Sequence, residues 1–155
     1  QGRAVCYLGT NASTAKHMTS PHFTHIDHLG IAVANLAEAE ARYTAMFGVE
    51  PYKREEVERE GVMTSFFQVG PNKIELLEAT KADSPIAKHV EKRGEGLHHV
   101  AYLVKDIRAE MARLKAEGFQ LLSEEPKPGA DGMLVAFVHP RTAGGVLVEL
   151  CQPQF

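Results

Sequence analysis

The sequence has few cysteines, no cationic run and no long apolar segment, and each shortage excludes a class of protein. Cys6 and Cys151 are the only cysteines in 155 residues, which indicates no disulfide framework and predicts a reducing, cytosolic setting. A formal charge of −3 without a basic run argues against a nucleic-acid partner. No apolar stretch approaches the roughly 20 residues of a membrane span, and no charged start leads into an apolar signal segment. We therefore expect a cytosolic domain whose partner is neither a nucleic acid nor a membrane.

The first 17 residues differ from the rest of the chain. They show no hydrophobic periodicity, and His17-Met18 resembles a cloning junction before a natural start. We expect residues 1–17 to lie outside the fold, either as cloning-derived sequence or as a frayed N-terminal arm. Residues 18–155 suit one domain, or two very small modules that share a core, in a chain that is 44% hydrophobic.

The hydrophobic pattern then predicts a strand, a helix and three strands. Residues 24–34 alternate and are rich in Ile and Val, which is typical of a strand. A helix is expected from Asn35, a good N-cap with Glu38 three residues later, to Gly48. The remaining elements are an edge strand over 49–57 and a hairpin of strands 62–69 and 73–79 around a turn at 70–72.

The same order restarts after a short linker helix, which is expected over about 83–93. The second set comprises a strand over 97–104, a helix from Asp106 to Gly118, a strand over 119–123, a loop over 124–132, and strands over 133–138 and 146–151. The sequence therefore predicts an α+β fold of two paired βαβββ modules that form a curved mixed sheet. We define module one as residues 24–80 and module two as residues 96–152.

Three pairs of landmarks support an internal repeat. They are His28 with His99, Gly48 with Gly118, and Ile74-Glu75-Leu76 with Val148-Glu149-Leu150, at separations of 71, 70 and 74 residues. Each module thus supplies one histidine on its first strand and one glutamate on its last strand. Two equivalent modules related by a pseudo-twofold axis would bring all four side chains to one centre.

The four side chains predict a metal site at the centre of the sheet. Taken singly, His28 or His99 is more typical of a hydrogen-bonded core histidine, and Glu75 or Glu149 is as typical of a solvent-exposed sheet face. Taken together, two imidazoles and two carboxylates suit a divalent ion such as Co, Mn, Ni, Fe or Zn, with positions left for substrate.

Other residues near the four candidate ligands are assigned supporting or structural roles. The small residues Gly30, Ala32 and Ala101 are expected to leave room for a substrate beside the histidines. His98 adjoins His99 and is expected to point the opposite way, in a supporting or structural role. Cys151 could be a nucleophile, but packing is the stronger interpretation for a lone cysteine that closes a strand. Three other histidines have weaker claims to the site, namely His25, His89 and His139.

These motifs resemble those of the vicinal oxygen chelate superfamily, which includes glyoxalase I, extradiol dioxygenases and antibiotic-resistance proteins. The details are most similar to the methylmalonyl-CoA epimerase family, over about residues 24–152. The similar segments are Ile26-Asp27-His28-Leu29-Gly30-Ile31-Ala32-Val33, Lys73-Ile74-Glu75-Leu76-Leu77-Glu78, Asp83-Ser84-Pro85-Ile86-Ala87, Gly94-Glu95-Gly96-Leu97-His98-His99, Glu124-Glu125-Pro126-Lys127-Pro128-Gly129, and His139-Pro140 with Gly145-Val146-Leu147-Val148-Glu149-Leu150.

The resemblance implies interconversion of (2R)- and (2S)-methylmalonyl-CoA with cobalt or a similar divalent ion. The proton at C2 would leave to give a metal-stabilised enolate. Glu149 is expected to serve as a ligand first and a proton carrier second, and Glu75 the reverse. This sequence has Thr64 where some relatives carry a glutamate, and threonine cannot be that base. A homodimer is also implied.

Some alternatives stay open at this point. The same metal set would suit a glyoxalase I-like isomerase of a hemithioacetal, and the same fold serves non-catalytic small-molecule-binding resistance proteins. Lys127 and Arg141 are candidates to bind the CoA phosphates, although ordinary solvated loop charges are the more common role for such residues.

Overall fold

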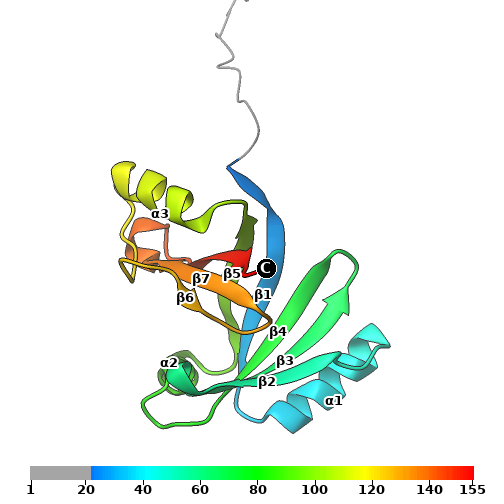
Figure 1. Ribbon diagram of the computed structural model, residues 1–155. Coiled ribbons are helices and arrows are strands. Elements are labelled where there is room, and N and C mark those ends of the chain that lie inside the picture. Colours follow the sequence, from blue (N-terminus) through cyan, green and yellow to red (C-terminus); the bar gives the residue numbers. More distant parts are fainter. Residues whose placement is uncertain (1–21) are drawn as a thin grey trace, which may run out of the picture.

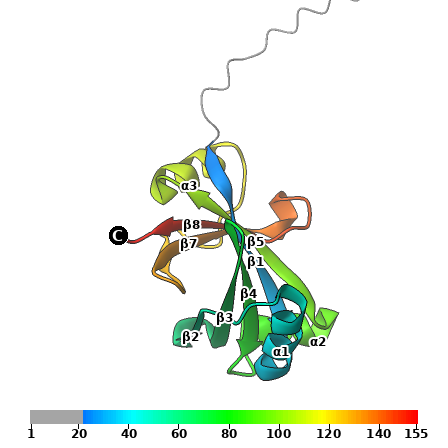
Figure 2. The ribbon, with the colours of Figure 1, turned by 90° about the vertical axis from the view of Figure 1, so that its right-hand side faces the viewer.

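Two four-stranded halves join along their first strands into one curved, eight-stranded sheet (Figures 1 and 2). The structure is a computed structural model that describes residues 22–155, so the expectation for residues 1–17 lies outside the described residues. The elements are β1 (Phe23–Val33), α1 (Leu36–Phe47), β2 (Lys53–Val57), β3 (Val62–Val69), β4 (Asn72–Ala79), α2 (Pro85–Arg93), β5 (Gly96–Val104), α3 (Ile107–Ala116), β6 (Lys127–Pro128), β7 (Met133–Val138) and β8 (Val148–Pro153).

The strand order is a palindrome about the central pair. It reads β2-β3-β4-β1-β5-β8-β7-β6, so each half repeats the same arrangement outward from its first strand. β1 is parallel to β4, β5 is parallel to β8, and the two halves meet in the antiparallel pair β1–β5. This mixed sheet with its three α-helices confirms the predicted α+β fold of paired βαβββ units.

Helix α1 begins and ends where the sequence predicts. The side-chain oxygen of Asn35 accepts a hydrogen bond of 3.0 Å from the backbone N–H of Glu38, and Gly48 adopts a left-handed φ of 72° at the other end. α3 has the same kind of start, because Asp106 accepts a bond of 3.0 Å from the N–H of Ala109. Among the described residues, no helix is long and apolar enough to cross a membrane.

The hydrophobic cores lie between the helices and the outer face of the sheet. In the first half, Leu36 of α1 packs with Leu76 of β4; in the second, Ile107 of α3 packs with Leu150 of β8. Side chains alternate along a strand. Burying Leu76 and Leu150 against the helices therefore turns the neighbouring residues of β4 and β8 to the inner face.

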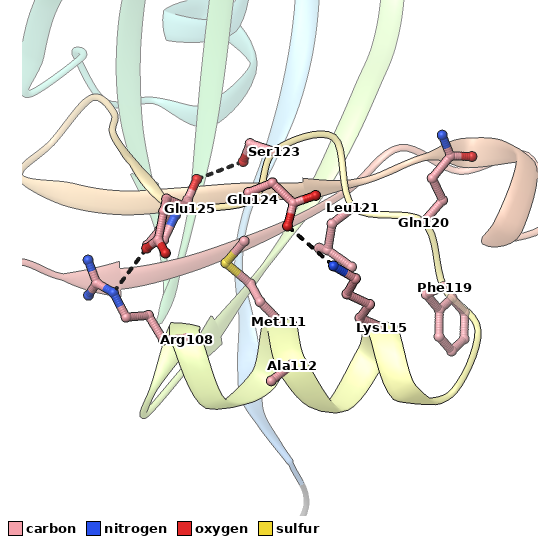
Figure 3. Close-up of a pocket in the computed structure, with 11 residues that line it drawn as sticks. Arg108, Met111, Ala112, Lys115, Phe119, Gln120, Leu121, Ser123, Glu124 and Glu125 are labelled. Carbon is pink, nitrogen blue, oxygen red and sulfur yellow. Dashed lines mark hydrogen bonds and ion pairs between the residues drawn. The ribbon is translucent and has the colours of Figure 1, made fainter.

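The prediction of a strand over 119–123 is wrong. Only Leu121 forms an isolated bridge, to Val138, and the segment instead runs beside α3 (Figure 3). At its start, the N–H of Phe119 bonds to the carbonyl oxygen of Leu114 at 3.0 Å and the N–H of Gln120 to the side-chain oxygen of Thr142 at 3.1 Å, so pairing with β7 is confined to the bonds on either side of Leu121.

Two strand boundaries of module two also differ from the prediction. β6 has two residues, Lys127–Pro128, inside the predicted loop 124–132. It stays short because neither Pro126 nor Pro128 can donate a backbone hydrogen bond. β8 spans Val148–Pro153, whereas residues 146–151 were expected.

Candidate functional site

The structure brings the four predicted ligands together at the middle of the inner face. They come from the four central strands, β4, β1, β5 and β8. Cross-strand pairing puts Glu75 and His99 on either side of Gly30, and His28 and Glu149 on either side of Ala101. Gly30 of β1 and Ala101 of β5 therefore occupy equivalent positions, each between one histidine and one glutamate on the neighbouring strands. This is the pseudo-twofold relation that the repeat predicts.

The donor atoms converge on one point. Nε2 of His28 lies 3.2 Å from Nε2 of His99 and 2.9 Å from Oε2 of Glu149. Oε2 of Glu75 lies 3.2 Å from Nε2 of His28 and 3.4 Å from Nε2 of His99. Adjacent donors around an ion bound at about 2.1 Å stand about 3 Å apart. The spacing of His28, His99 and Glu149 fits one divalent cation, and Glu75 contacts both imidazoles but is not part of that potential metal-binding group.

An orphaned oxygen supports the same interpretation. Oε2 of Glu149 is buried, and although Nε2 of His28 and of His99 lie 2.9 and 3.2 Å away, neither ring makes an aligned hydrogen bond to it. A buried carboxylate oxygen without a partner is costly. The three atoms belong to one potential metal-binding group, and a cation held by this set would satisfy them all.

Each histidine ligand is preceded by a residue that bulges out of the β1–β5 ladder. Residues Ile26 and His28 pair with consecutive residues of β5, which leaves Asp27 unpaired. Its Oδ2 lies 2.8 Å from Nδ1 of His28. His98 is left unpaired in the same way, and its Nδ1 lies 2.9 Å from Nδ1 of His99. Both bulged side chains therefore contact the ring nitrogen that faces away from the metal position, as partners that orient ligands do.

The bulge at His98 makes one expectation wrong. Strict alternation predicts that His98 points away from His99, but the two rings contact each other and line the same cavity. The expectation for Gly30 is also wrong. A Cβ built on Gly30 would stand 2.6 Å from Nε2 of His99 and closer still to Cε1 and Nδ1. The space beside Gly30 holds an imidazole and not a substrate.

Asp27 connects the site to a charged network at one end of the sheet. Its carboxylate pairs with Lys73 at 3.0 Å, and Lys73 also pairs with Asp131 at 3.2 Å. Asp131 belongs to the loop between β6 and β7 and accepts a hydrogen bond of 3.1 Å from Tyr52. Lys73 and Tyr52 are on module one and Asp131 is on module two, so this network ties the two modules together behind His28. Asp27 and Lys73 did not emerge from the sequence as site residues.

The carboxylates and imidazoles strongly shift one another's pKa values. Burial lowers the pKa of His28, but contacts with Asp27 and Glu149 outweigh it and raise that pKa to about 12. Burial has the same effect on His99, and Glu149 and Glu75 raise its pKa to about 9. Burial raises the pKa of Glu75, and the two imidazoles lower it to about 2. Without a metal ion, the histidines therefore hold protons at pH 7.

Binding of Co²⁺ to the metal-free protein at pH 7 is expected to release about two protons, because a ligating imidazole must be neutral. The sign follows from pKa values of about 12 for His28 and about 9 for His99, both above 7. Affinity for the ion should therefore fall as the pH falls. Calorimetric titration in buffers of different ionisation enthalpy measures the release. The His25→Ala variant, changed at an exposed residue of β1, should match the original protein, and a heat independent of the buffer would contradict the expectation.

Two adjacent cavities lie beside the quartet at His99 and share lining residues. The smaller one, of about 240 Å³, has mostly apolar walls and reaches His99. The larger one, of about 470 Å³, also reaches His99 and carries the cations of α2. Both contain Pro85, His98 and Leu147. Together they offer an apolar inner chamber and a cationic outer groove.

The hollow in Figure 3 is separate from this system. It lies between α3 and the segment after it, and none of the four predicted ligands lines it. Lys127 lines another hollow, beside Glu124 and Glu125. Neither Lys127 nor Arg141 is among the residues that line the two adjacent cavities.

The other residues that the sequence suggested for the site lie outside the quartet. Cys151 is buried in a small hydrophobic cluster, its thiol lies 3.4 Å from the carbonyl oxygen of Tyr102, and burial raises its pKa. These contacts favour packing over a nucleophilic role. His25 is exposed. His89 lines the outer groove, and His139 caps a short turn by accepting a hydrogen bond from the N–H of Arg141 at 3.0 Å.

Comparison with known proteins identifies the family. The profile of the glyoxalase/bleomycin resistance protein/dioxygenase superfamily matches residues 27–137. An ethylmalonyl-CoA/methylmalonyl-CoA epimerase of Cereibacter sphaeroides is 42% identical over 129 residues, which cover 82% of this chain and 96% of that protein. The structure of methylmalonyl-CoA epimerase from Mycobacterium tuberculosis is 34% identical, with a TM-score of 0.85 and coverage of 90% of this chain and 95% of that one.

A structure with a bound CoA compound is similar as well. It is a Streptomyces coelicolor methylmalonyl-CoA epimerase variant in complex with 2-nitronate-propionyl-CoA, 35% identical with a TM-score of 0.82, covering 85% of this chain and 96% of that one. The chain belongs to the glyoxalase/bleomycin resistance protein/dioxygenase superfamily and, within it, to the family of the methylmalonyl-CoA epimerases.

Proposed function

We propose that the protein interconverts (2R)- and (2S)-methylmalonyl-CoA with the help of a divalent metal ion. The observation that carries the proposal is the convergence of two imidazoles and two carboxylates on one point beside an apolar chamber. Family membership supplies the substrate class, because the similar structure from Streptomyces coelicolor is a complex with a CoA thioester analogue. Cobalt is the proposed ion, since a set of nitrogen and oxygen donors suits such borderline cations.

The chemistry needs an acidic proton and a place for the charge that its loss creates. C2 of methylmalonyl-CoA lies between a thioester and a carboxylate, so removal of its proton gives an enolate. A divalent ion held by His28, Glu75, His99 and Glu149 would supply positive charge beside the enolate oxygens. The apolar walls of the 240 Å³ chamber keep water away from the reacting carbon.

Two of the proposed ligands are also proposed proton carriers. We assign Glu149 primarily as a ligand and secondarily as a proton carrier, and Glu75 the reverse. Thr64 faces the same side of the sheet as its cross-strand partner Leu77 but has no carboxyl group. Its hydroxyl donates a hydrogen bond of 2.8 Å to the carbonyl oxygen of Glu55. Thr64 therefore has a structural role and takes no part in proton transfer.

The outer groove is the proposed site for the CoA phosphates. Lys88, Lys92 and Arg93 of α2 all line it, and it adjoins the chamber at His98 and His99. We therefore assign the phosphates to these cations and not to Lys127 or Arg141, neither of which lines the groove. A thioester that enters with its acyl end first would leave its phosphates beside these cations.

Reversing two charges of the groove is expected to weaken substrate binding. In the double variant Lys92→Glu/Arg93→Glu, KM for methylmalonyl-CoA should rise roughly tenfold or more with kcat nearly unchanged, because the phosphates bind equally in the ground and transition states. The effect should shrink at high salt. Lys127→Glu is the matched control and should leave KM unchanged. An equal effect of Lys127→Glu would place the phosphates elsewhere.

Conversion of one epimer into the other tests the proposed function. The metal-loaded protein is incubated with (2S)-methylmalonyl-CoA, and the (2R) epimer is measured. A hemithioacetal of methylglyoxal and glutathione serves as the competing substrate, because the same ligand set would suit a glyoxalase I-like isomerase. Turnover of the hemithioacetal without epimerisation would overturn the proposal, as would binding of the thioester without turnover. The homodimer and the cytosolic setting stay predictions.

A further inference from the structure

We propose that Glu60 is a second acid–base residue of this site, which carries the C2 proton from the module-one wall of the inner chamber. The inference rests on the proposed epimerase function and deepens it. It assigns a catalytic role to a residue that no sequence motif indicated.

The chain holds Glu60 in a fixed place at the edge of the chamber. It is the last residue of a 3₁₀ turn, Glu58–Glu60, that joins β2 to β3 and ends at Gly61 with a left-handed φ of 63°. The carbonyl oxygen of Gly61 accepts a hydrogen bond of 2.7 Å from the N–H of Thr80. The turn is therefore anchored to the end of β4.

The chamber surrounds Glu60 with apolar groups and one proposed ligand. Val62 and Leu77 of module one and Phe137 of module two line it, and His99 reaches it from the metal position. The side chain of Glu60 is half-buried. Among residues 22–155, no hydrogen bond or ion pair to the Glu60 carboxyl is found. An unpartnered carboxyl in such surroundings costs free energy, which favours a role toward a ligand over a structural one.

The electrostatics of the chamber suit proton transfer. Burial raises the pKa of Glu60. A base whose pKa lies closer to the working pH is more effective in both directions of transfer.

Epimerisation requires two proton carriers on opposite faces of a planar intermediate. Glu60 belongs to module one and takes the place of Glu75 as the proton carrier of that module, which leaves Glu75 as a ligand. Glu149 belongs to module two. From one epimer, the Glu60 carboxylate takes the C2 proton, and the C–H electron pair enters the enolate. Glu149, which is protonated at the start of this direction, then donates its proton to the other face of C2. This re-forms the C–H bond in inverted configuration and leaves Glu149 as a carboxylate. From the other epimer, the same steps run in reverse.

Isotope exchange in the Glu60→Gln variant tests the assignment. Each epimer is incubated separately in D₂O, and deuterium at C2 and configuration are both measured. The original protein should exchange and invert both epimers. In Glu60→Gln, inversion should fall by about 100-fold or more, one epimer should still exchange C2 hydrogen with retention, and the other should lose exchange. Glu60→Asp, which keeps a shorter carboxyl, should restore part of both. Glu58→Gln, in the same turn at an exposed position, is the control.

Two outcomes would overturn the role of Glu60. One is inversion by Glu60→Gln within about twofold of the original rate, and the other is an equal loss of exchange for both epimers at unchanged metal content. The second result would indicate a role in substrate binding. Failure of the original protein to exchange either epimer would instead refute the proposed function itself.

Discussion

Replacing Gly30 with alanine is expected to remove the metal ion without changing any ligand. The added methyl group would lie 2.6 Å from Nε2 of His99 and closer to two other ring atoms, so the imidazole must leave its position. Gly30 itself has no positive φ, so alanine fits the backbone there. We expect metal affinity to fall by about 100-fold or more, because even residues that only orient a ligand are worth 10–100-fold. Metal content by mass spectrometry and the dissociation constant by titration measure the effect.

Gly48→Ala provides the matched control for this change. Gly48 has a φ of 72° and open space around it, so alanine there costs about 1 kcal/mol of stability but touches no site residue. Its metal affinity should equal that of the original protein. Normal metal affinity in Gly30→Ala would show that His99 is not held where this structure places it.

Replacing His99 with alanine is expected to abolish both metal binding and C2 exchange. The change removes one of two imidazole donors and leaves Glu75 and Glu149 as two buried carboxylates with a single nitrogen partner, His28. The remaining set has lost one of its two nitrogen donors, so it should bind a cation only weakly. We expect metal content close to zero at micromolar metal, and exchange slower by about 10³-fold or more.

His25→Ala is the control for His99→Ala, because His25 lies on the neighbouring strand β1 and is exposed. It should keep both properties, and melting temperatures measured for both variants would separate a site effect from a loss of fold. Retention of metal and exchange by folded His99→Ala would remove this residue from the site.

The fold could be predicted from the sequence because its signals are local and repeated. Asn35 with Glu38 marks a helix start in any context, and Gly48 marks its end. The repeat then placed His28 opposite His99, since equivalent positions of two paired modules meet at the axis between them. The spacing of one histidine and one glutamate per module thus carried information that no single residue had.

The features that sequence reasoning missed depend on contacts across the sheet. Alternation predicts which way His98 points only if the strand is regular, and a bulge in the β1–β5 ladder reverses that orientation. Asp27 was missed for the same reason, because its contact with His28 depends on the bulge that leaves it unpaired with β5. Glu60 lies far from any motif, and the chamber around it forms only when both modules and α2 come together. The strand expected over 119–123 failed because the backbone N–H groups of Phe119 and Gln120 bond to Leu114 and Thr142, which leaves pairing with β7 around Leu121 alone.

The most direct test of the account is exchange of the C2 hydrogen of methylmalonyl-CoA for deuterium, with metal-loaded and EDTA-treated protein compared. We predict exchange by the loaded protein, its loss after EDTA treatment, and its return when Co²⁺ is added back in excess of the chelator. Exchange that survives complete removal of the metal, verified by mass spectrometry, would contradict the claim that the quartet acts through a bound ion.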